Sequence, residues 1–233
     1  MRGLALLAAL CCAAEANAID ISEARYADPT TRYAHGVLGD TIEWGALEMR
    51  GEDGRLYRVT LPQTRVFEDV APRLFDVDGD GKSEVIAVEA DVNRGARLSI
   101  YDTEGLVAAN EFIGTRFRWL APTGVGAADL DGDGAVELAF VDRPHLAKTL
   151  RVYRYSEDGL TLVGSLPGVT NHRIGEADIA GGIRTCGAGP EVIVATSDWS
   201  RLVAVSFDGA GFETRDVGPH AGRDSFAAAM RCE

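Results

Sequence analysis

The chain has 233 residues, of which 46% are hydrophobic, and a formal net charge of −13 at neutral pH. This charge argues against nucleic acid or an anionic membrane as a partner, because both repel an acidic surface. The hydrophobic fraction is high enough for a sizeable core. After the N-terminal segment, no run approaches the roughly 18 apolar residues that a membrane-spanning helix needs, so we expect no transmembrane segment in the mature chain.

The first 18 residues have the pattern of a secretory signal peptide. Arg2 gives a short basic segment, and residues 4–14 form an apolar run that is too short to span a bilayer. Ala16-Asn17-Ala18 matches an A-x-A cleavage site. We therefore expect a mature chain that begins at Ile19 and is exported, either to the periplasm or into the medium.

Strand patterns begin downstream of the predicted cleavage site. Residues 42–48 and 55–59 are typical of strands, being rich in apolar and aromatic side chains between turn residues. We interpret them as the second and third strands of a repeat unit. The acidic loop of that unit is reduced to residues 38–40.

Two acidic nonapeptides, 76–84 and 129–137, lie in the middle of the chain. Each has carboxylates at positions 1, 3, 5 and 9 and a glycine at position 6, where the chain must bend. Alternating hard oxygen ligands are typical of Ca²⁺ rather than of a transition metal. The alternative interpretation is a pair of solvated acidic turns. The predicted ligands are Asp76, Asp78, Asp80, Glu84 and the carbonyl of Lys82 in the first loop, and Asp129, Asp131, Asp133, Glu137 and the carbonyl of Ala135 in the second.

An EF-hand also binds Ca²⁺ through closely spaced acidic residues. It needs a bidentate glutamate at position 12 and a helix on each side of the loop. Position 12 is Ala87 in the first loop and Phe140 in the second, and strand patterns flank both loops. The EF-hand is therefore excluded.

Each acidic loop belongs to a repeat of an entering strand, the loop, a leaving strand and a further strand. A third copy has the strand pattern without the full set of acidic residues. The first aspartates are Asp76, Asp129 and Asp178, and this period of about 50 residues is typical of a β-propeller. The expected strands are 73–75, 85–88 and 97–101 in the first copy, 126–128, 138–141 and 150–155 in the second, and 175–179, 191–195 and 201–205 in the third.

The predicted fold is all-β, a small β-propeller of four blades, or five if residues 19–41 contribute more. Residues 226–231 have the pattern of an entering strand with no blade after it. We expect this C-terminal strand to close the ring by pairing inside the first blade, and we expect no helix after the signal peptide. Residues 19–233 would form a single domain, with repeats near 35–72, 73–125, 126–173 and 174–231.

The motif D-x-D-G-D-G-x-x-E between an entering strand and an apolar strand resembles the FG-GAP/VCBS repeat of integrin-α-like propellers. Both acidic loops match it fully, and the strand pattern extends the resemblance over roughly residues 35–207. The resemblance implies a β-propeller whose loops bind Ca²⁺ through the carboxylates named above. It also implies a role in adhesion, ligand binding or scaffolding.

Two cysteines, Cys186 and Cys232, remain after the predicted cleavage. In an oxidising compartment, two cysteines are typical of one disulfide, and two free thiols are the alternative. Cys186 lies in the loop of the third copy, and Cys232 follows the expected C-terminal strand and would occupy the equivalent loop of the neighbouring blade. We hypothesise that a Cys186–Cys232 disulfide staples the closing seam and replaces Ca²⁺ in the loops that lack it.

Two polar and aromatic segments, 116–119 and 170–176, precede entering strands, where a propeller gathers its loops around a central channel. They suggest a ligand-binding rim, with inter-blade packing as the alternative. The candidate rim residues are Arg116, Arg118, Trp119, His172, Arg173 and Glu176.

The function favoured by the sequence is an exported, calcium-stabilised propeller that binds a protein or a glycan or serves as a scaffold. The alternative is a lyase or hydrolase that acts on an extracellular polymer through the region of His172 and Glu176. A structural module of an envelope assembly is a third reading. The fold does not decide whether the protein is an enzyme.

Overall fold

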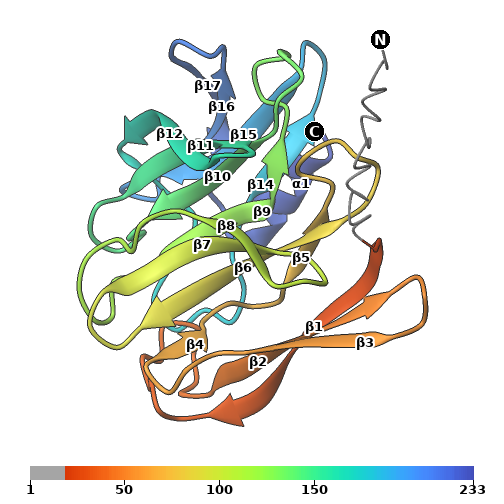
Figure 1. The fold of residues 1–233 in the computed structure, drawn as a ribbon. Helices are drawn as coiled ribbons and strands as arrows, with labels where there is room; N and C mark the ends of the chain where they lie inside the picture. The colour runs from red at the N-terminus through yellow and green to blue at the C-terminus, as the bar shows by residue number, and fades with distance from the viewer. Residues whose placement is uncertain (1–18) are drawn as a thin grey trace, which may run out of the picture.

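In residues 19–233, which are those that the computed structural model describes, the chain forms strands β1 to β17 and one short helix, α1 (Figure 1). The predicted signal peptide, residues 1–18, lies outside the described residues. The strands belong to three sheets of eight, four and five strands. The prediction of an all-β fold is confirmed.

The eight-stranded sheet has the order β1-β2-β4-β6-β7-β8, with β3 paired to β2 and β5 paired to β6. The single pair Trp44–Phe67 connects β2 to β4, so β1–β3 form a nearly separate part of this sheet. Its strands are β1 (Ile21–Thr30), β2 (Glu43–Gly51), β3 (Leu56–Thr60), β4 (Arg65–Phe67), β5 (Arg73–Phe75), β6 (Glu84–Asp91), β7 (Gly95–Tyr101) and β8 (Leu106–Ala109).

The four- and five-stranded sheets follow the plan of β4–β8. A central strand pairs on one side with an inner strand that is split or has a register shift. On the other side it pairs with an antiparallel strand, which pairs in turn with a fourth, outermost strand. The four-stranded sheet contains β9 (Leu120–Ala128), β10 (Glu137–Asp142), β11 (Thr149–Ser156) and β12 (Gly159–Pro167). The five-stranded sheet contains β13 (Val169–Thr170), β14 (Gly182–Thr185), β15 (Pro190–Thr196), β16 (Arg201–Phe207) and β17 (Phe212–Pro219).

The sheets are stacked face to face, because successive residues of each central strand point into different cores. In β6, Val85 and Ala87 pack with residues of β1–β3, whereas Ile86 and Val88 pack with residues of the four-stranded sheet. The central strands β10 and β15 divide their side chains between two cores in the same way. Because both faces are covered, these strands read as continuous apolar runs.

The predicted C-terminal strand at 226–231 is wrong. Residues Arg223–Met230 form α1, which packs on the outer face of the five-stranded sheet and does not pair inside the first repeat. The three alanines 227–229 have high helix propensity, and Phe226 and Ala229 fall on one helical face, where both are buried. The expectation of no helix is wrong for the same reason. Among residues 19–233, no helix is long and apolar enough to cross a membrane.

The expected entering strand at 175–179 is also wrong. This segment is a loop between β13 and β14, and β14 is the strand that pairs with the start of β15. Asp178 therefore does not hold the first position of a third acidic loop. The hydrophobic spacing misled the prediction, because the inner strand of this sheet is split around an insertion.

Candidate functional site

The two acidic loops occupy the same place in successive repeats. Residues 76–83 connect β5 to β6, and residues 129–136 connect β9 to β10. The ninth residue of each motif begins the central strand and pairs with the last residue of the inner strand, as Phe75–Glu84 and Ala128–Glu137. The strand register thus places both predicted loops equivalently.

Backbone amides shape the first loop around its carboxylates. Asp76 accepts hydrogen bonds from the N–H groups of Gly79 (2.8 Å) and Gly81 (3.0 Å). Glu84 reaches back and accepts one from the N–H of Val77 at 2.9 Å. Gly81 has φ +86°, a conformation that glycine adopts without strain, which explains the glycine at position 6.

The first loop fits a hard divalent cation. One carboxylate oxygen from each of Asp76, Asp78 and Glu84 lies within 4.8 Å of the others. This spacing is about twice the Ca²⁺–oxygen distance of roughly 2.3–2.6 Å, and the donors are all oxygens. Asp80 instead accepts a hydrogen bond from the N–H of Lys82 (2.8 Å), and the Lys82 ammonium lies 3.4 Å from the same carboxylate.

Glu84 is the least solvated carboxylate of the first loop. It is 4% exposed. Burial, together with repulsion from Asp78, Asp80 and Asp76 and against the hydrogen bond from the N–H of Val77, raises its pKa to about 7. Among the described residues, Asp76, Asp78 and Glu84 form no ion pair. A cation from solution would offset this repulsion.

The second loop has an equivalent cluster, formed by Asp129, Asp131 and Glu137. It differs in one respect: Arg154 of β11 lies directly opposite Glu137 in the strand register. Arg154 Nε is 2.6 Å from Glu137 Oε1, Nη1 is 3.0 Å from Asp133 Oδ2, and Nη2 pairs with Asp131. Burial raises the pKa of Glu137, and the hydrogen bond from Arg154 opposes that rise.

The third equivalent hairpin, β14–β15, is closed by the pair Thr185–Pro190 and has a short loop, 186–189. Cys186 takes the position of the first aspartate and forms a disulfide with Cys232, with 5.7 Å between Cα atoms. The predicted disulfide is confirmed. The predicted place of Cys232 in the loop of a neighbouring blade is wrong, because Cys232 follows α1, which packs on the same sheet.

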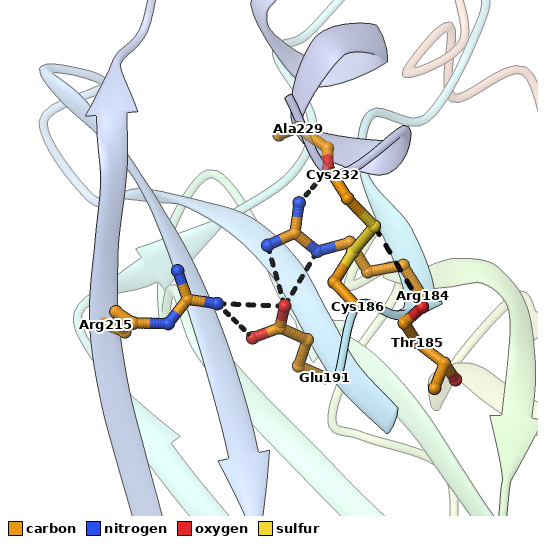
Figure 2. The surroundings of a disulfide bond; sticks show 7 residues. All are labelled: Arg184, Thr185, Cys186, Glu191, Arg215, Ala229 and Cys232. Atoms are coloured by element: carbon orange, nitrogen blue, oxygen red, sulfur yellow. Dashed lines mark hydrogen bonds and ion pairs between the residues drawn. A yellow bond between two sulfur atoms is a disulfide. The ribbon is translucent and has the colours of Figure 1, made fainter. Parts of the chain in front are cut away.

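A hollow of about 840 Å³ lies beside the disulfide. On its wall, Glu191 lies between two arginines, 2.7 Å from Arg184 and 2.7 Å from Arg215 (Figure 2). Arg184 also donates to the carbonyl of Ala229 in α1 and is nearly buried, whereas the side chain of Arg215 is 59% exposed. Other lining residues come from the second acidic loop and from the β16–β17 hairpin, among them Asp131, Ser206, Phe207 and Asp208.

Two of the predicted rim residues form a buried contact. The rings of Trp119 and His172 meet edge-on with centroids 4.9 Å apart, and both residues are almost fully buried. His172 interacts through both ring nitrogens, with His145 Nε2 at 3.0 Å and with the carbonyl of Glu176 at 2.9 Å. Burial lowers the pKa of His172. The Glu176 carboxylate instead pairs with Arg223 at 2.7 Å, so His172 and Glu176 do not form an acid–base pair.

The other rim residues lie around this buried contact. Arg116 is exposed, with its guanidinium over the ring of Phe117 at 4.6 Å. Arg173 is exposed as well and lies over the ring of Trp199 at 4.2 Å. Arg118 is half-buried, and its carbonyl accepts a hydrogen bond from the N–H of Ala96. These residues lie apart from the lining of the hollow.

The sequence interpretation missed Arg154 and the charged group of Arg184, Glu191 and Arg215. A usable signal existed for Arg154: pairing β10 with the following strand in antiparallel register brings this arginine opposite Glu137. The register of β14 with β15 likewise pairs Arg184 with Glu191. That signal depended on placing β14 correctly.

Comparison with known families identifies the segment that contains the two acidic loops. Residues 76–140, which include both acidic loops, match the family described as FG-GAP-like repeat. The prediction of an FG-GAP repeat protein is confirmed for this segment. No match was found among curated proteins.

Proposed function

We propose that this protein is an exported, calcium-stabilised β-propeller module that binds a protein or a glycan. The observation that carries the proposal is the FG-GAP-like repeat at 76–140, with an acidic loop in the same hairpin of two successive repeats. The stacked sheets support a propeller in which β1–β3 form an incomplete first blade and three complete blades follow.

Calcium would act in this module as a structural ion. Asp76, Asp78 and Glu84 would hold it, and the ion would supply positive charge between carboxylates that otherwise repel one another. The amides of the loop already orient Asp76 and Glu84. Binding would therefore fix the β5–β6 hairpin with little rearrangement of the chain.

Export is supported by the disulfide between Cys186 and Cys232. Disulfides form and persist in oxidising compartments and are rare in the reducing cytosol. This agrees with the signal-peptide pattern of the first 18 residues. Periplasm and medium both meet this condition.

The hollow beside the disulfide is the surface that best fits a ligand. Its volume of about 840 Å³ lies within the range of ligand pockets, roughly 300–1,000 Å³. Arg215 offers an exposed guanidinium on its wall, and Phe207 adds an aromatic ring. Six of the lining residues are acidic and two are arginines, so a neutral sugar chain or a basic protein segment would match this lining.

A capture experiment tests the proposal. The mature protein is immobilised in millimolar CaCl₂ and exposed to an envelope fraction and, separately, to a glycan array. We expect a captured species that is lost with Arg215→Ala and retained with Arg25→Ala. Arg25 is the matched control, since it is similarly exposed, pairs with the shielded carboxylate of Glu48 at 2.6 Å and lies outside the lining of the hollow. Equal capture by both variants would show that the hollow is not the binding surface.

A further inference from the structure

We propose that Arg154 takes the place of the cation in the loop 129–137, so that the loop 76–84 is the cation site of this pair and the second loop binds no metal in the native protein. The inference deepens the proposed function and rests on its calcium site. It departs from the sequence pattern, in which both loops have the same carboxylates at the same positions.

The geometry of Arg154 carries the inference. Its guanidinium contacts Asp131, Asp133 and Glu137, which are three of the four acidic residues of the motif. Two of the three residues in the metal-compatible cluster, Asp131 and Glu137, are thus already paired. A metal ion would have to displace a planar, permanently charged group that donates several hydrogen bonds.

Among residues 19–233, no arginine pairs with the first loop as Arg154 does with the second. Antiparallel pairing of β6 and β7 matches Val85 with Tyr101, so the next pair in the same register places Asp102 opposite Glu84. Asp102 turns its carboxylate to the β7–β8 turn, where it accepts hydrogen bonds from the N–H groups of Glu104 and Gly105. The same position in the two repeats therefore holds a cation in one and an anion in the other.

Position 1 of the motif provides a matched pair of variants. Asp76 accepts two amide hydrogen bonds at 2.8 and 3.0 Å, and Asp129 accepts two at 2.7 and 3.0 Å. Neither is paired with an arginine or lysine among the described residues. Asp76→Asn and Asp129→Asn thus remove one charge from nearly identical surroundings, with similar effects on folding.

Native mass spectrometry of the mature protein with CaCl₂ tests the inference by counting bound Ca²⁺. We expect one ion in the wild type and in Asp129→Asn, and none in Asp76→Asn. In Arg154→Gln we expect a second ion, and in Arg154→Lys, which keeps a cation, we expect one. The isothermal titration of the same proteins should give the same numbers.

The outcomes separate the inference from the function on which it rests. Two ions in the wild type, one of which is lost in Asp129→Asn, would overturn the inference and leave the calcium module standing. No ion in the wild type would overturn the calcium site of the proposed function. A folded Arg154→Gln protein that still binds a single ion would contradict the role given to Arg154.

Discussion

The loops 76–84 and 129–137 have the same motif, the same hairpin and the same amide hydrogen bonds, yet they differ in the charge placed opposite their ninth residue. Arg154 is opposite Glu137 and pairs with the second loop, whereas the β6–β7 register, continued by one residue beyond Val85–Tyr101, puts Asp102 opposite Glu84. A repeated set of carboxylates therefore does not by itself define a metal site. The residue that faces the pattern from the next strand must also be known.

The β14–β15 hairpin is stabilised in a third way, by a covalent cross-link. Its short loop has no acidic cluster, and Cys186 at the first position is covalently joined to Cys232. Three equivalent hairpins are therefore held by a cation from solution in our proposal, by an arginine and by a disulfide. We therefore expect the stability of the three hairpins to respond differently to reducing agent, to calcium and to a chelator.

The largest effect is expected from loss of the disulfide. The cross-link joins residues 46 apart in the sequence, and it is worth about 4 kcal/mol in the chain-entropy model. Cys186→Ser with Cys232→Ser should lower the free energy of unfolding by about this amount in urea denaturation. Wild-type protein in reducing agent should match the double variant. An unchanged midpoint in the variant would show that the disulfide does not hold this hairpin.

The next effect is expected for Arg154→Gln without calcium. Removing one partner of a buried ion pair costs about 3 kcal/mol, because Glu137 would remain buried beside two aspartates without a cation. Added CaCl₂ should restore most of the loss, measured by thermal unfolding.

Arg151→Gln is the matched control for that variant. Arg151 lies on the same strand with the same 29% side-chain exposure, and its partner Asp142 keeps a second arginine, Arg143, at 2.7 Å. We expect a smaller loss of stability that calcium does not restore. Equal restoration of both variants by calcium would argue for a nonspecific effect of the ion.

A buried carboxyl group can also be accommodated without a cation if it stays protonated, and Glu43 provides a test of this. It is 3% exposed, and burial, followed by repulsion from Glu68, raises its pKa to about 9. Between pH 4.5 and 9 the unfolded chain releases this proton and the folded chain keeps it, so stability falls as pH rises through this window. Glu43→Gln should remove that loss, which amounts to about 2.5 kcal/mol between pH 5 and pH 7. A stability difference between the two proteins that is the same at both pH values would contradict the raised pKa.

A smaller effect is expected from chelation. At about ten times its Kd, one calcium ion adds roughly 1.4 kcal/mol to stability. Excess EGTA should therefore lower the Tm of the wild type and of Asp129→Asn, and leave Asp76→Asn unchanged. If Asp129→Asn lost its response to EGTA and Asp76→Asn kept it, the assignment of the two loops would be reversed.

The smallest effect is expected when an arginine equivalent to Arg154 is introduced into the first repeat. Asp102→Arg places a guanidinium opposite Glu84, and it should reduce the shift that EGTA causes by about 1 kcal/mol. Asp102→Asn, which keeps a hydrogen-bond acceptor for the turn, is the control and should retain the full shift. A full EGTA response in Asp102→Arg would indicate that position alone does not decide metal dependence.

The sequence predicted the features that repeat. Apolar central strands such as 85–88 and the identical acidic loops recur with a regular period, so pattern and register agree. The disulfide could be predicted because only Cys186 and Cys232 remain after the expected cleavage. These features depend on local sequence and on counting residues.

The features that the sequence did not reveal depend on tertiary packing. Residues 226–231 are apolar enough for a strand, but the three alanines favour the helix that covers the last sheet. The function of Arg154 as a counter-ion depends on the register between β10 and β11. The hollow is formed where the second acidic loop, the Cys186–Cys232 disulfide and the strands β16 and β17 meet. Its lining residues are therefore far apart in the sequence.

In our proposal the two equivalent acidic loops hold different cations, a metal ion in the first and the guanidinium of Arg154 in the second. Crystals of the mature protein soaked with Tb³⁺, which replaces Ca²⁺ and gives a strong anomalous signal, test it most directly. We expect an anomalous peak between Asp76, Asp78 and Glu84, and we expect the guanidinium of Arg154 against Asp131 and Glu137 with no peak beside it. A peak among Asp129, Asp131 and Glu137, with Arg154 displaced, would contradict it.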